Sequence, residues 1–196
     1  MRLADRARDI REIDHFDRET DVLVVGLGAA GAAATLEASR CGAETLAIER
    51  AGGGGGTSAM SGGVLYLGGG TPVQRACGFD DSPDEMFKYL MASCGDAPDD
   101  AKIRLYCEHS VAHYQWIAEQ GVPFKHSFHH GVSGEPPTDD GLVYSGSELA
   151  HPFCELAVPA PRGHVPRGEN AVGHLLMRHL LAACLLYTSP SPRDRS

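Results

Sequence analysis

The sequence predicts an α/β fold organised around a Rossmann-like βαβ unit. Three observations support this prediction. An apolar run at 22–25 leads directly into the glycine motif at 26–31, an alanine-rich segment follows it, and a second apolar run at 45–48 ends at the acidic residue Glu49. A strand, a glycine turn, a helix and a parallel strand in this order, with an acid at the tip of the second strand, are typical of a dinucleotide-binding unit.

Each glycine of the motif has a physical role in this interpretation. Gly26 lets the chain turn sharply after the first strand, Gly28 lets a pyrophosphate approach the backbone, and Gly31 lets the helix pack closely on the sheet. The phosphates are expected beside Ala29 and Ala30, because unpaired N–H groups and the helix dipole favour negative charge at a helix N-terminus. A glycine-rich turn without ligand is the alternative, but the flanking strands and the spaced acid argue against it.

Glu49 follows the second apolar run and is followed by Arg50. A carboxylate at this point can accept hydrogen bonds from both hydroxyls of an adenosine ribose, and it would repel a phosphate on that ribose. The motif alone does not choose between NAD and FAD.

Residues 51–70 contain so many glycines that we expect no packed element there. Ordering five consecutive glycines costs much entropy, so a bound molecule is expected to hold them. A long cofactor passing the backbone fits this expectation, and Thr57, Ser58 and Ser61 offer hydroxyls to it. A flexible linker is the alternative, although core-type residues such as Met60 and Val64 interrupt the pattern.

The βαβ unit, the Glu-Arg pair and the following Gly-Gly-Thr-Ser-Ala-Met-Ser-Gly-Gly resemble the FAD-binding domain of the fumarate reductase and succinate dehydrogenase flavoprotein family. Residues 71–76 and 78–82 are similar to its 3-ketosteroid Δ1-dehydrogenase branch. The resemblance runs from about 21 to 183 and implies an incomplete FAD-binding domain with the start of a substrate-capping α+β region.

The resemblance also implies which residues bind FAD. The glycine motif would hold the pyrophosphate, Glu49 the ribose, and 57–63 would follow the pyrophosphate and the flavin. Succinate dehydrogenases carry a histidine that bonds covalently to the flavin at the position of Gly56, so FAD is expected without a covalent link. The residues expected at the cofactor are Gly26, Gly28, Ala29, Ala30, Gly31, Glu49, Arg50, Gly56, Thr57, Ser58, Ser61, Gly62 and Gly63.

Composition narrows the class of protein. The chain has 196 residues, of which 42% are hydrophobic, and a formal net charge of -9, which suits one globular core and argues against nucleic acid as a partner. No apolar run approaches the roughly 20 residues that span a bilayer. Six cysteines lack C-x-x-C spacing and the N-terminus lacks a signal-peptide pattern, so a reducing cytoplasm is expected.

The remaining elements follow in order. Residues 1–20 carry both signs of charge with apolar residues at helical spacing, and we expect an N-terminal arm. Ser82 with Glu85 forms a capping-box pattern that predicts a helix to about 93. Residues 99–120 have the clearest amphipathic pattern, which indicates a core-facing helix ended by Gly121.

Residues 124–168 are rich in Pro, Gly and His and show little periodicity, so an irregular loop-rich region is expected. His126, His129 and His130 suggest a metal site, but no carboxylate or cysteine stands at ligand spacing, and a polar loop without metal is favoured. The sequences 144–146 and 159–164 are unusual, and an arginine or tyrosine there could reach a carbonyl-bearing substrate or the flavin.

The last part of the chain divides in two. Residues 169–183 have helical spacing. Residues 184–194 match, residue for residue, one reading frame of a transposase adapter used for DNA libraries, so 184–196 are expected to be a non-native tail. The predicted divisions are an arm (1–20), the N-terminal part of an FAD-binding domain (21–123), a region leading towards a capping domain (124–183) and this tail.

These patterns favour an FAD-dependent oxidoreductase that acts on a carbon-carbon bond next to a carbonyl. A steroid-like ketone and a small dicarboxylate are the two substrate classes, and the similarity at 71–82 favours the ketone. The alternatives are an NAD-linked dehydrogenase, which leaves 52–63 unexplained, and a non-catalytic FAD-binding fragment. The sequence assigns no catalytic residue and no electron acceptor.

Overall fold

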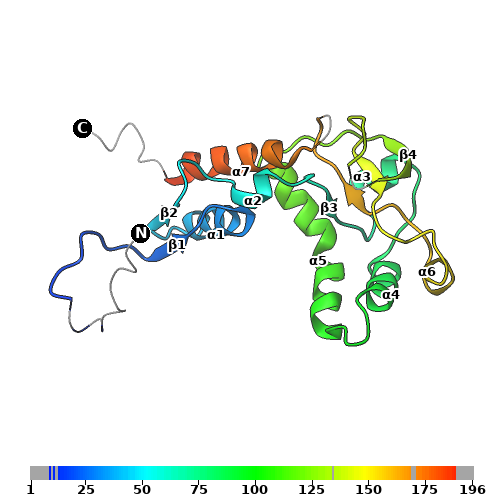
Figure 1. Cartoon of the computed structure of the whole chain (residues 1–196), viewed down its shortest axis with the longest axis horizontal. Coiled ribbons are helices and arrows are strands. Elements are labelled where there is room, and N and C mark those ends of the chain that lie inside the picture. Colours follow the sequence, from blue (N-terminus) through cyan, green and yellow to red (C-terminus); the bar gives the residue numbers. More distant parts are fainter. Residues whose placement is uncertain (1–8, 10, 12, 134, 169–170, 189–196) are drawn as a thin grey trace.

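The predicted βαβ unit forms. β1 (Val22–Val25) and β2 (Thr45–Ile48) pair in parallel, with Val22 opposite Thr45, and α1 (Ala29–Arg40) connects them (Figure 1). The computed structural model describes residues 9, 11, 13–133, 135–168 and 171–188. Within this part of the chain the α/β class is confirmed.

A second sheet has four short strands in the spatial order β3-β6-β5-β4. β5 and β6 pair antiparallel, as do β6 and β3, whereas β4 and β5 run parallel. The strands come from well-separated parts of the chain: β3 (Leu65–Tyr66), β4 (Phe128–Val132), β5 (Leu142–Tyr144) and β6 (Gly163–His164).

Two of the predicted helices form with the expected caps. α4 (Pro83–Ser93) begins after Ser82, whose side chain accepts a hydrogen bond from the Glu85 N–H. The second half of the predicted capping box is replaced, because the Glu85 carboxylate accepts from Lys88 and from the backbone of Val158. α5 (Asp100–Glu119) also has its predicted bounds and buries one face.

The remaining helices are α2 (Gly56–Ala59), α3 (Pro72–Ala76), α6 (Phe153–Leu156) and α7 (Gly173–Thr188). α7 lies along α1 (Figure 1), and the main core joins these two helices to α5. Leu36 of α1, Ile117 of α5 and Leu180 of α7 are all buried in it. This core fixes where the βαβ unit meets the rest of the chain.

Two expectations about local structure were wrong. Residues 51–70 contain α2 and β3 and bury Leu67, and 124–168 contain three strands and α6. Both regions are ordered by contacts with distant segments, which their sequences do not reveal. Residues 13–20 of the arm carry no helix, and most of its predicted helical face lies outside the described residues.

The predicted C-terminal helix starts later than expected, at Gly173, and residues 169–170 lie outside the described residues. α7 continues to Thr188, so it crosses the predicted boundary at 184, and Cys184 is buried. Residues 189–196 lie outside the described residues, and the origin of the tail stays a prediction.

Candidate functional site

The glycine turn (residues 26–31) requires glycine at two positions. Gly26 has φ +94°, a conformation that side chains with a Cβ rarely adopt, and its N–H donates to the Ile48 carbonyl at 2.7 Å. A Cβ on Gly31 would lie 1.8 Å from the Gly26 carbonyl oxygen. The predicted sharp turn and the close approach of the helix are therefore both present.

The N-terminus of α1 presents backbone rather than side chains. Its N-cap residue, Gly28, has no side chain to cap the helix, and the first turn contains no acid. The Ala29 N–H donates to the Ser58 hydroxyl at 3.2 Å. Since the helix dipole and terminal N–H groups favour an anion, this end of α1 fits a pyrophosphate.

Glu49 lies where its carboxylate meets two backbone amides. It accepts from the Leu27 N–H at 2.8 Å and from the Ala51 N–H at 2.9 Å. These amides, that of Ala51 most strongly, hold the pKa of Glu49 below its ordinary value. The carboxylate is thus ionised, and its two oxygens have lone pairs left for ribose hydroxyls.

A hollow of about 270 Å³ opens at the tips of β1 and β2. It is lined by Val25, Gly26, Ile48, Glu49 and Arg50, so it brings Glu49, the residue predicted at the ribose, and Arg50 to the edge of the glycine turn. An acceptor, a cation and a bare backbone share this hollow, which suits one end of a dinucleotide.

The residues 54–63, here called the glycine segment, lie against the glycine turn. The Gly55 N–H donates to the Leu27 carbonyl at 2.7 Å, and α2 begins one residue later. Gly55 and Gly56 have φ values of +113° and +50°. The segment therefore follows a path that needs glycine, and the short helix within it places Ser58 on Ala29.

The hydroxyls of the glycine segment differ in their surroundings. Ser61 is exposed, as Thr57 is, but its hydroxyl donates to the Ser58 carbonyl at 2.8 Å and accepts from the Gly63 N–H at 3.2 Å. Ser58 and Ser61 thus shape the backbone, and we expect the exposed Thr57 hydroxyl to be available to a cofactor. Gly62 lies apart from the glycine turn, beside the side chain of Glu135.

The sequence did not identify the support beneath the glycine segment. Gly173, at the start of α7, donates its N–H to the Ser61 carbonyl at 3.1 Å, and the Val172 N–H donates to the Gly62 carbonyl at 3.2 Å. A glycine at the first position of a helix was the available signal, but nothing local ties it to a segment more than a hundred residues earlier.

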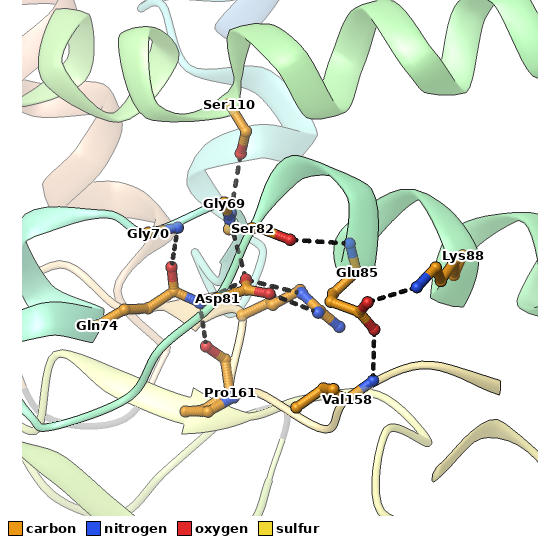
Figure 2. A network of polar contacts seen from close by, with 12 residues as sticks. Gly69, Gly70, Gln74, Asp81, Ser82, Glu85, Lys88, Ser110, Val158 and Pro161 are labelled. Carbon is orange, nitrogen blue, oxygen red and sulfur yellow. Dashed lines mark hydrogen bonds and ion pairs between the residues drawn. The ribbon is translucent and has the colours of Figure 1, made fainter. Parts of the chain in front are cut away.

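A second polar cluster joins α3, the loop that precedes α4, and the residue before β6. Arg162 is fully buried and pairs with Asp81 through two contacts, of 2.7 and 3.1 Å. Gln74 donates to the same carboxylate at 2.9 Å and accepts from the Gly70 N–H at 3.0 Å, and Asp81 also accepts from the Gly69 N–H at 2.9 Å. Figure 2 shows this buried network. Arg162, from the unusual sequence 159–164, therefore stabilises the fold and is not exposed to a substrate.

His164 extends the buried network towards α3. Its Nδ1 lies 3.1 Å from the Arg162 carbonyl, which can only accept, so its Nε2 accepts from the Thr71 hydroxyl at 2.7 Å. Burial lowers the pKa of His164 to about 4. The ring is neutral, and a proton added at Nε2 would reverse the direction of the bond with Thr71 and place a charge in the buried network.

The clustered histidines at 126–130 lie on or just before β4. His129 and His130 belong to β4, contrary to the expected loop, and His129 lies 3.9 Å from Asp140. In the described part of the chain, no group of three or more His, Cys, Asp or Glu side chains is arranged to hold a metal ion. No helix among the same residues is long and apolar enough to cross a membrane.

Comparison with known proteins adds to this geometry. The model of the family described as "FAD binding domain" matches residues 21–185. A 3-oxo-5-alpha-steroid 4-dehydrogenase of Comamonas testosteroni is 35% identical over 156 residues, which are 77% of this chain and 29% of that protein. The acrylate reductase flavoprotein subunit of Shewanella woodyi is 38% identical over 143 residues, 71% of this chain and 28% of that subunit.

A solved structure is also similar. The 3-ketosteroid-Δ4-(5α)-dehydrogenase from Rhodococcus jostii RHA1, in complex with 4-androstene-3,17-dione, superposes with a TM-score of 0.89 at 50% identity. The match covers 93% of this chain and 39% of that one. The chain thus spans well under half the length of each of these relatives.

Proposed function

This chain belongs to the family of FAD-binding domains, and we propose that it is the FAD-binding part of an oxidoreductase that dehydrogenates a 3-ketosteroid-like substrate at a carbon-carbon bond near the ketone. The observation that carries the proposal is the 50% identity to the Rhodococcus dehydrogenase over 93% of the chain. FAD is the cofactor of this family, and the glycine turn, Glu49 and the glycine segment form a surface that fits it.

The chain's own residues would bind and orient the cofactor. The amides at the N-terminus of α1 would hold the pyrophosphate, Glu49 the ribose, and the region from Gly56 to Gly63 the part nearer the flavin. When bound, FAD supplies the acceptor for the hydride that leaves one carbon of the bond, while a proton leaves the neighbouring carbon. Gly56 offers no side chain to a flavin, so we propose that FAD is held without a covalent bond.

We assign no catalytic residue within this chain. The chain matches only 29% of the Comamonas protein and 39% of the Rhodococcus protein. We propose that the groups that move protons lie in the part of those proteins that this chain does not match. Residues 21–123 would then serve mainly the cofactor, and 124–183 would lead towards the capping domain. We also propose a cytoplasmic location, because the six cysteines are scattered without C-x-x-C spacing.

The position of the bond is proposed from the same similarity. The Rhodococcus enzyme is named for the Δ4 position, whereas residues 71–82 resemble the Δ1 branch. We favour Δ4, because 50% identity over nearly the whole chain outweighs a short motif. Reduction of a small unsaturated acid is the second candidate, favoured by the 38% identity to the acrylate reductase subunit.

One experiment tests cofactor and substrate together. FAD is added to a longer form of the protein that also carries the region its relatives have beyond the match, because the proton-moving groups are proposed to lie there. The flavin absorbance is followed as a 4,5-saturated 3-ketosteroid is supplied to the oxidised flavin, or acrylate to the reduced flavin. Bleaching by the steroid, with 4-androstene-3,17-dione formed from its saturated counterpart, is the expected result. Steroid-insensitive flavin that is reoxidised by acrylate would favour the second candidate. A protein whose unfolding midpoint is unchanged by excess FAD would overturn both, since a ligand that binds only the folded state raises its stability.

A further inference from the structure

One face of α7 lies along the whole glycine segment. Gly173, Met177 and Leu181 are spaced four residues apart, so they share that face. Leu181 is so near to Gly54 that a Cβ there would lie 2.7 Å from its side chain, and a Cβ on Gly55 would lie 3.7 Å from that of Met177. The glycines of this segment therefore make room for α7 as well as for a cofactor.

The contact is closest at the start of α7, where backbone meets backbone. A Cβ on Gly173 would lie 2.4 Å from the Ser58 carbonyl oxygen and 2.5 Å from that of Ser61. In the other direction, a Cβ on Gly63 would lie 2.6 Å from the Gly173 nitrogen. These are main-chain atoms that no rotamer change can move, so glycine is required although it is a poor helix former.

The position of Ser58 connects this contact to the glycine turn. Its carbonyl faces Gly173, and its hydroxyl accepts the hydrogen bond from the Ala29 N–H at the start of α1. A displacement of Ser58 away from α7 would therefore change the N-terminus of α1, where a pyrophosphate fits. Gly173 is far from Ala29 in the sequence, but only two contacts, both made by Ser58, connect them.

We propose that Gly173 is a positioning residue for FAD: it lets the α7 backbone hold residues 58–63 in the shape that the cofactor requires. This inference rests on the proposed binding of FAD by the glycine turn and the glycine segment. Gly173 itself acts through Ser58, Ser61 and Gly63 and is not placed in contact with the cofactor.

The test compares two variants, each of which adds one heavy atom to α7. Gly173→Ala places a methyl against the Ser58 and Ser61 carbonyls, whereas Ala182→Ser adds a single oxygen to an exposed position of the same helix. FAD affinity is measured by titration of the purified protein. Hydrogen exchange of the amides in 54–63 is measured without FAD, so that one readout is independent of the cofactor.

We expect Gly173→Ala to weaken FAD binding by about tenfold or more and to speed exchange within 54–63, because the methyl displaces main-chain atoms. Exchange in α5 should stay unchanged, which separates a local displacement from unfolding. Ala182→Ser should bind FAD as the wild type does. If the wild type binds FAD and Gly173→Ala binds it equally well, the inference is wrong while the proposed function stands. If the wild type does not bind FAD, the proposed function fails, and the exchange data alone show whether Gly173 shapes the segment.

Discussion

The glycine turn and the buried network both contain contacts to glycine main-chain atoms. The residues that make these contacts are close in sequence in the turn and far apart in the network. In the turn, Gly26 and Gly31 are five residues apart and contact each other directly. In the network, Asp81 pairs with Arg162, which is 81 residues away, and both contact groups beside Gly68–Gly70. A local motif can therefore be predicted residue by residue, whereas the partners in the network become apparent only in the folded chain.

The two regions also differ in what a substitution would remove. The turn is made of backbone atoms at close range, so it is sensitive to added volume. The network is made of charged and polar side chains without access to water, so it is sensitive to the loss of a partner. We therefore expect the free energy of unfolding to fall most when a side chain of the network is truncated, and when a single atom is added to a glycine of the turn.

Asp81→Ala should have the largest effect on stability. It would leave the buried guanidinium of Arg162 unpaired and remove the acceptor of Gln74 and Gly69, so we expect a loss of about 3–5 kcal/mol in the free energy of unfolding. Asp84→Ala removes an exposed partner of Arg104 and should cost about 1 kcal/mol or less. Denaturant unfolding measures both. Equal costs would show that the network is not the stabilising element that its burial indicates.

Gly31→Ala should have the next largest effect, and it tests the turn. The added methyl would meet the Gly26 carbonyl oxygen, a main-chain atom that cannot move aside, and we expect a cost of about 3 kcal/mol together with loss of FAD binding. Gly53→Ala adds the same methyl where no atom lies within 4 Å, so its stability should match the wild type. A Gly31→Ala protein with native stability and affinity would contradict the close packing of α1 on the turn.

The pH dependence of stability should report on His164. Its pKa in the folded state is about 4, below the ordinary value near 6.5, so the unfolded chain takes up the proton first as the pH falls. Stability from this group is complete above pH 6.5 and decreases towards pH 4, by about 2 kcal/mol between pH 7 and pH 5. His164→Gln does not titrate, and its unfolding free energy should vary less over this range. Parallel curves for the two proteins would mean that His164 is not buried as a neutral ring.

How far the sequence predicts the structure follows from the same distinction. The βαβ unit, the cap at Ser82 and the helix at 100–119 were predicted because each depends on neighbours a few residues away. The second sheet was not, because strands of two to five residues carry little periodicity and are held by distant partners. Glu49 follows β2, but its bond to the Leu27 N–H depends on how β1 and β2 align, and its role at the ribose stays a prediction.

The smallest expected effect belongs to the link between the glycine turn and the glycine segment. Ser58→Ala removes the acceptor of the Ala29 N–H and should cost about 1 kcal/mol in stability, as loss of one hydrogen bond at a helix N-terminus usually does. Thr57→Ala deletes the neighbouring, exposed hydroxyl and should leave the stability of the cofactor-free protein unchanged. The two variants separate two roles of a hydroxyl. If Thr57→Ala weakens FAD binding while Ser58→Ala mainly lowers stability, the Thr57 hydroxyl serves the cofactor and the Ser58 hydroxyl joins the glycine segment to the glycine turn. The reverse pattern would mean that the segment is oriented differently, with Ser58 facing the cofactor.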